Sequence, residues 1–169
     1  DHLGEAVQIG RELDLIEPRL FGLAHVANFR TYMAQFEDAW QTAQEGRRLA
    51  EEVGHRQFYT ELLTFPIGLY HLRNGDMEAA LQAAQEGVDV AAQIGAASSV
   101  SAGSYLLGQV AWLQGGYEAA IRHYDRALEA ARAAGSSWSE AIILCALGTT
   151  NLDISHEFES ELPRFHGEA

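Results

Sequence analysis

The heptapeptide Gly75-Asp76-Met77-Glu78-Ala79-Ala80-Leu81 returns 40 residues later as Gly115-Gly116-Tyr117-Glu118-Ala119-Ala120-Ile121. Weaker copies occupy residues 34–40 and 1–7. A fixed period of this size is typical of stacked copies of one supersecondary unit. The sequence therefore predicts a repeat array, an architecture that usually presents a surface to binding partners.

Each repeat predicts two helices separated by a short turn that contains glycine. The turns are Asn74-Gly75-Asp76 and Gln114-Gly115-Gly116, and the second helices end at Gly54, Gly95 and Gly135, with spacings of 41 and 40 residues. Glycine suits these positions because it adopts a positive φ without steric cost. After each turn, apolar residues recur at i, i+3 and i+4, which predicts one buried stripe along the second helix.

The first helices of the units are predicted over residues 20–34, 56–74, 98–114 and 137–152. Each carries a small residue at the same phase, and these residues are Ala27, Gly68, Gly108 and Gly148. Glycine in the middle of a helix costs about 1 kcal/mol relative to alanine, so its recurrence indicates a packing reason. We expect these residues to let the two helices of a hairpin approach closely.

Four local features add detail to this prediction. Ser98 and Ser99 are expected to cap one first helix, and Ser137-Trp138-Ser139-Glu140 has the pattern of a capping box for the next. Pro66 lies inside a predicted helix and should kink it, because it lacks an N–H donor. Cys145, the single cysteine, lies between apolar residues and is expected to be buried.

Composition excludes several classes of function. Net charge is −13, with 24 acidic and 11 basic residues, so the electrostatic field repels nucleic acids and anionic membranes. No stretch approaches the roughly 18 apolar residues of a membrane span, and the polar start Asp1-His2-Leu3-Gly4-Glu5 is unlike a secretory signal. The low cysteine content favours a reducing, cytoplasmic location.

The repeat resembles the tetratricopeptide repeat (TPR) family over residues 1 to about 153. The resemblance rests on three patterns. An aliphatic residue precedes the small residue of the first helix, as in Leu107-Gly108, and a shared motif follows the turn, as in Gly115–Ile121. An aromatic–alanine–leucine pattern comes later in the second helix, as in Tyr124, Ala127 and Leu128. Pro18 matches the proline that often closes a unit. The units, near 40 residues, are similar to arrays at the C-terminal ends of bacterial signalling ATPases, LuxR-type regulators and adenylate or guanylate cyclases.

This resemblance implies an all-α, right-handed superhelical solenoid of antiparallel helix hairpins. It implies one array with partial units at 1–18 and 136–169 and full units at 19–54, 55–95 and 96–135. Because the chain begins and ends within units, we expect it to be a fragment of a larger protein.

The sequence offers no catalytic constellation. The seven histidines show no His-x-x-x-His spacing, and no phosphate-binding loop or Gly-x-Ser-x-Gly elbow is present. We therefore expect no enzymatic activity, no cofactor and no metal site.

In the TPR family, the first helices line a concave groove. The equivalent positions of this chain are therefore its candidate binding residues. They are Phe21, His25, Asn28, Tyr32, Phe65, Leu69, Arg73, Tyr105, Gln109 and Trp112, with Leu62, Leu113, Cys145 and Thr149 beside them. Asn28 and Gln109 are expected to hold peptide backbone groups, and the aromatic side chains to supply apolar contact.

The predicted function is a regulatory scaffold that recognises a protein, a peptide or another domain of its parent chain. Two alternatives stay open. One is a small-molecule-sensing effector domain, and the other is a homo-oligomerisation scaffold, with a homodimer formed through the uncapped ends of the array.

Overall fold

The computed structural model describes residues 2–13 and 15–161, and every regular element in this part of the chain is a helix. The elements are α1 (His2–Glu12), α2 (Ile16–Tyr32), α3 (Phe36–Glu52), α4 (Arg56–Leu62), the π-helical segment η1 (Leu63–Ile67), α5 (Gly68–Arg73), α6 (Met77–Ile94), α7 (Ala97–Leu113), α8 (Tyr117–Ala133) and α9 (Ser137–Glu161). The segments α4, η1 and α5 follow one another without a break and act as one first helix.

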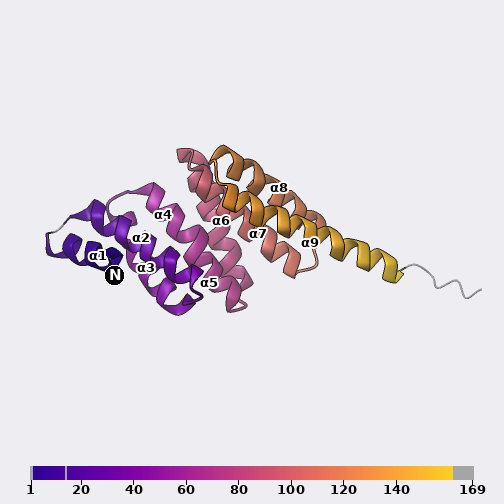
Figure 1. Cartoon of the computed structure of the whole chain (residues 1–169), viewed down its shortest axis with the longest axis horizontal. Helices are drawn as coiled ribbons and strands as arrows, with labels where there is room; N and C mark the ends of the chain where they lie inside the picture. Colours follow the sequence, from indigo (N-terminus) through magenta and orange to yellow (C-terminus); the bar gives the residue numbers. More distant parts are fainter. Residues whose placement is uncertain (1, 14, 162–169) are drawn as a thin grey trace, which may run out of the picture.

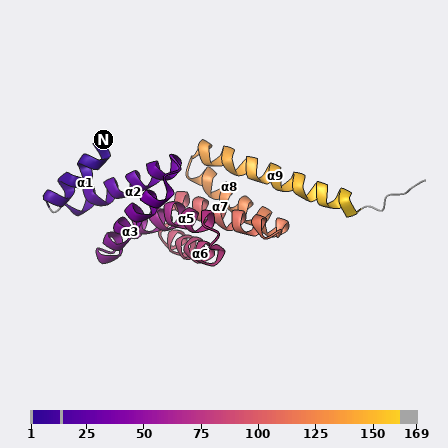
Figure 2. The same cartoon turned by 90° about the horizontal axis from the view of Figure 1, so that it is seen from below.

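The helices form hairpins that stack in chain order (Figure 1). α2 pairs with α3, α4–η1–α5 with α6, and α7 with α8, and each hairpin also packs on the next. α2 and α9 lie on one side of the array, whereas α3 and α6 lie on the other (Figure 2). The predicted all-α solenoid of helical hairpins is thereby confirmed.

Small side chains dominate the core between the hairpins. Three buried clusters follow one another along the array, and their fully buried members include Ala27, Ala43, Ala84, Val88 and Ala127. Those in α3, α6 and α8 lie at the i, i+3 and i+4 positions of the predicted stripes, and Ala27 is the predicted small residue of α2. Alanine in such positions lets helix axes approach closely, so the repeated pattern encodes the stacking itself.

Glycine provides still closer approach at several points along the array. A Cβ added at Gly108 would lie 2.4 Å from the ring of Tyr124, which confirms the expected contact within a hairpin. A Cβ at Gly68 would lie 2.3 Å from Leu106, which belongs to the next hairpin, so this glycine serves the stacking between units. Gly148 has no such neighbour, because no described helix packs on that face of α9.

The repeated tetrapeptide Ala-Gln-Glu-Gly at residues 43–46 and 84–87 has the same physical basis. A Cβ on its final glycine would lie 2.8 Å from Leu62 in the case of Gly46 and 2.2 Å from Thr64 in the case of Gly87. The first helix of the second full unit is therefore held by a glycine of the preceding α3 and by a glycine of its own partner, α6.

The predicted turn glycines are confirmed, with φ values between 68° and 77°. Ala34 occupies the equivalent turn of the first full unit at φ 59°, the only positive φ of a non-glycine residue among the described residues.

The capping predictions were wrong in detail. α9 is capped by Ser136, whose Oγ accepts the Ser139 N–H at 3.3 Å, and not by Ser137. α7 begins after Ala96 without a side-chain cap. Ser98 and Ser99 therefore do not cap it, and Ser99 is buried between helices.

Three helices also differ from their predicted bounds or shape. α2 begins at Ile16, so Pro18 lies in its first turn, where a missing N–H is tolerated, and does not close the preceding unit. α9 runs to Glu161, nine residues beyond the predicted 152. Pro66 interrupts its helix as expected, and the irregularity takes the form of the π-helical segment η1.

Two glycine substitutions separate a packing role from helix propensity. Gly108→Ala should destabilise the fold by about 1–3 kcal/mol, because the new methyl group would overlap Tyr124. Gly148→Ala should stabilise it by up to about 1 kcal/mol, because alanine favours the helix and meets nothing there. Urea unfolding followed by circular dichroism measures the change in the free energy of unfolding for each variant. Equal changes in the same direction for the two variants would contradict this packing.

Candidate functional site

A hollow of about 490 Å³ crosses the face formed by the first helices. α2, α4, η1, α7 and α9 all contribute side chains to its wall. Its lining residues include Asn28, Tyr32, Gln57, Glu61, Phe65, Ser98, Tyr105, Trp138, Ser139 and Ile142.

A second hollow of about 480 Å³ lies between α7 and α9 and shares Tyr105, Trp138 and Ile142 with the first. The two hollows therefore adjoin at these side chains, and we call them together the concave groove. Cys145 lines the second hollow and is exposed, so the expectation that it is buried was wrong. Among the described residues, no helix packs over this part of α9 to cover the thiol.

At one end of the groove, Asn28 and Glu61 form a pair across α2 and α4. Asn28 Nδ2 donates a hydrogen bond to Glu61 Oε1 at 2.6 Å. Asn28 Oδ1 is buried and accepts no hydrogen bond. The pair therefore fixes the orientation of both side chains and leaves acceptor oxygens without donors.

At the other end, Gln109 is bound into the wall of the groove. Its amide nitrogen donates to the hydroxyl of Tyr105 at 3.1 Å and to the hydroxyl of Tyr124 at 3.2 Å. The pKa of Tyr124 is raised to about 12. Burial is the main cause, the neighbouring Tyr105 contributes in the same direction, and the hydrogen bond from Gln109 opposes the rise. Because both amide hydrogens are used here, only the Gln109 carbonyl remains for the predicted contact with a ligand backbone.

The wall and floor of the groove are further tied by buried polar bonds. Trp112 Nε1 donates to Asp153 Oδ2 at 2.8 Å and joins α7 to α9. Beneath the groove, Thr60 donates to Ser99 at 3.1 Å, and Ser101 donates to the carbonyl oxygen of Ala127 at 3.0 Å. Ser99, expected to act at a helix start, instead joins α7 to the preceding hairpin, whereas Ser101 ties α7 to α8 within their own hairpin.

The structure gathers six of the ten predicted site residues in the groove. They are Asn28, Tyr32, Phe65, Tyr105, Gln109 and Trp112. Their binding roles remain predictions.

The other four lie outside both hollows. Phe21 and His25 stack on each other with ring centroids 3.9 Å apart. Leu69 packs on the core, and the guanidinium of Arg73 lies 4.8 Å from the centre of the Phe36 ring. Leu62, placed beside the groove by sequence, is fully buried beneath it.

The sequence reasoning missed Gln57, Glu61, Trp138 and Ile142, which all line the groove. Gln57, Glu61 and Phe65 are spaced four residues apart, as are Trp138 and Ile142. Residues with this spacing share one helix face. The spacing could therefore have added these residues once Phe65 had been placed in the groove.

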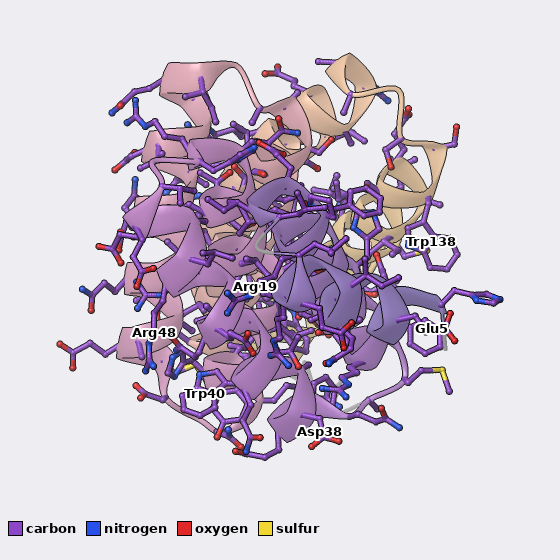
Figure 3. All side chains as sticks on the ribbon, turned by 90° about the vertical axis from the view of Figure 1, so that its left-hand side faces the viewer. Glu5, Arg19, Asp38, Trp40, Arg48 and Trp138 are labelled. Carbon is purple, nitrogen blue, oxygen red and sulfur yellow. The ribbon has the colours of Figure 1, made fainter. Side chains whose placement is uncertain are left out.

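A third hollow, of about 520 Å³, is lined by Arg19, Trp40 and Arg48. Trp40 and Arg48 lie on the opposite side of the array from Trp138 (Figure 3). Here Glu45 binds Arg11 at 2.6 Å and Arg19 at 2.9 Å. Burial raises the pKa of Glu45, but the two arginines outweigh this effect and leave the pKa below its ordinary value. Because these charges bind one another and join α1, α2 and α3, the concave groove is the stronger candidate site.

Among the side chains that the structure describes, no cluster of three or more histidine, cysteine, aspartate or glutamate residues is arranged to hold a metal ion. Among the helices of residues 2–13 and 15–161, none combines the length and the apolar character needed to cross a membrane.

No protein-family model and no curated protein matches the sequence. Solved structures do match, and one is the crystal structure of BtubC (BKLC) from P. vanneervenii. The similarity has a TM-score of 0.69 at 18% sequence identity and covers 90% of this chain. The chain spans 64% of the length of BtubC. At this level of identity the similarity establishes the fold, which is a helical repeat solenoid.

The raised pKa of Tyr124 gives the fold a measurable dependence on pH. Between its ordinary value of 10.0 and the folded-state value of about 12, the folded protein keeps a proton that the unfolded chain releases. The stability that Tyr124 contributes is present below pH 10 and is lost as pH rises through this interval. Urea unfolding at a series of alkaline pH values should therefore show that the free energy of unfolding falls more steeply with pH for the wild type than for Tyr124→Phe. Parallel curves would contradict this assignment.

Proposed function

We propose that this chain is a peptide-recognition module built from TPR-type units. It holds an extended segment of a partner protein, or of another domain of the parent chain, in the concave groove. The observation that carries the proposal is that the two adjoining hollows of the groove draw aromatic, amide and hydroxyl side chains from every first helix from α2 to α9.

The chemistry of the lining suits a polypeptide ligand. Tyr32, Phe65 and Trp138 offer apolar contact area at a low cost in conformational entropy. Gln57 and Ser98 supply side-chain donors and acceptors for the ligand backbone. This combination of a mostly apolar surface with a few polar groups is typical of specific recognition sites.

The dimensions of the groove also favour a peptide over a small molecule. Neighbouring helix axes lie about 8–10 Å apart, so a groove that crosses four first helices is roughly 25 Å long. An extended chain rises about 3.3 Å per residue, so roughly eight residues fit along it. A metabolite would cover only part of this length.

The groove wall is rigid at one end and irregular near the other. Gln109 and Trp112 are fixed by hydrogen bonds, whereas η1 breaks the regular helix at Thr64, Phe65 and Pro66. π-helical turns are frequent at functional sites. We propose that occupancy of the groove biases the curvature of the array at η1 and so changes how a neighbouring effector domain is held. The long repeat unit supports a place for this module in a larger cytoplasmic bacterial signalling protein.

A groove-filling variant tests the proposal. Peptides selected from a display library against the wild type should bind Ala102→Trp at least about tenfold more weakly, because the indole occupies the groove beside Tyr105. The matched control is Ala92→Trp, which places the same side chain on the exposed face of α6 and should bind normally. Equal binding by Ala102→Trp and the wild type, with circular dichroism confirming both folds, would contradict a role for the groove.

A further inference from the structure

The groove contains a single charged side chain. Glu61 is the only acidic residue among those that line its two hollows, and no arginine or histidine lines either of them. The whole chain has a net charge of −13 and no lysine. The groove therefore presents negative potential without a cation of its own, and this potential favours the approach of positively charged ligands.

Glu61 has unused capacity to accept hydrogen bonds. Its Oε1 accepts the bond from Asn28, whereas its Oε2 accepts no hydrogen bond from the side chains and backbone that the structure describes. Its side chain is partly buried, and no arginine or histidine among the described residues forms an ion pair with it. A partly buried carboxylate without a counter-ion gains most from a ligand that brings a positive charge and N–H donors.

Aromatic rings stand beside this carboxylate. Tyr32 and Phe65 line the same hollow as Glu61, and their ring centroids are 5.1 Å apart. Phe65 follows Glu61 by one helical turn, and Tyr105 contributes a third ring from α7. Aromatic faces attract cations, and the planar guanidinium group both stacks on rings and forms paired bonds with a carboxylate.

We infer that the concave groove recognises a basic segment of a partner protein and that an arginine side chain of this segment binds Glu61 among the rings of Tyr32 and Phe65. The inference rests on the proposed function and specifies the chemistry of its ligand. The rest of the groove, along Tyr105, Trp138 and Ile142, is free of charge and suits the apolar neighbours of that arginine.

The test uses fluorescence anisotropy with a labelled peptide in which arginine alternates with leucine and both ends are blocked. The protein should bind this peptide at least about tenfold more tightly than the same peptide with citrulline, which keeps the shape of arginine without its charge. Binding of the arginine peptide should also weaken as salt rises. Equal affinity for the two peptides would overturn the inference, and this comparison needs no change to the protein.

Protein variants locate the charge. Glu61→Gln still accepts a hydrogen bond from Asn28 but should lose about tenfold in affinity for the arginine peptide. Glu129→Gln removes the same charge from an exposed position on α8 outside both hollows and should bind as the wild type does. Unchanged binding by Glu61→Gln, or an equal loss in both variants, would overturn the inference.

The two proposals fail in different ways. If display-selected peptides bind the groove but show no preference for arginine, the cation inference fails and the peptide groove stands. If no peptide is sensitive to Ala102→Trp, both fail. If blocked single arginine binds as tightly as the peptide, the commitment to a peptide segment is overturned.

Discussion

The close approach of helices at small residues is the constraint on which the rest of the structure depends. Gly87 and Gly108 leave no room for even a methyl group beside Thr64 and Tyr124, and buried alanines continue these contacts along the stack. Because interiors are close-packed, each such contact fixes the separation of two helices. Repetition of the contact at a constant interval then produces an array whose first helices lie side by side, and the concave groove follows from that arrangement.

The groove adds a second level of organisation to this packing. The buried hydroxyl group of Thr60 bonds across hairpins and that of Ser101 bonds within its own hairpin, while Gln109 and Trp112 are held in place at the groove wall. Side chains that are fixed before binding lose little entropy when a ligand arrives. The glycine contacts and the polar bonds therefore have separate roles. The glycine contacts determine the shape of the groove, and the polar bonds fix the side chains on its surface.

The sequence predicted the fold well because the repeat is local: turn glycines, apolar stripes and small residues are each readable within one unit. The groove was harder to predict, because its lining depends on the rotation of each first helix. The π-helical segment around Pro66 contains wider turns, so the residues that follow it are rotated from their regular positions. Leu69 and Arg73 consequently lie outside the groove. Glu61 was missed because the projected groove took its neighbour Leu62, which is fully buried, as the lining residue. Cys145 was misplaced because burial depends on what packs outside α9.

Nuclear Overhauser effects in the uniformly labelled protein test the close packing most directly, because they report proton pairs in contact. We expect strong effects between the α protons of Gly46 and the δ-methyl groups of Leu62, and between the α protons of Gly68 and the δ-methyl groups of Leu106, because each pair joins two successive hairpins. Absence of both, in a spectrum where all four residues are assigned, would contradict the stacked arrangement and, with it, the groove.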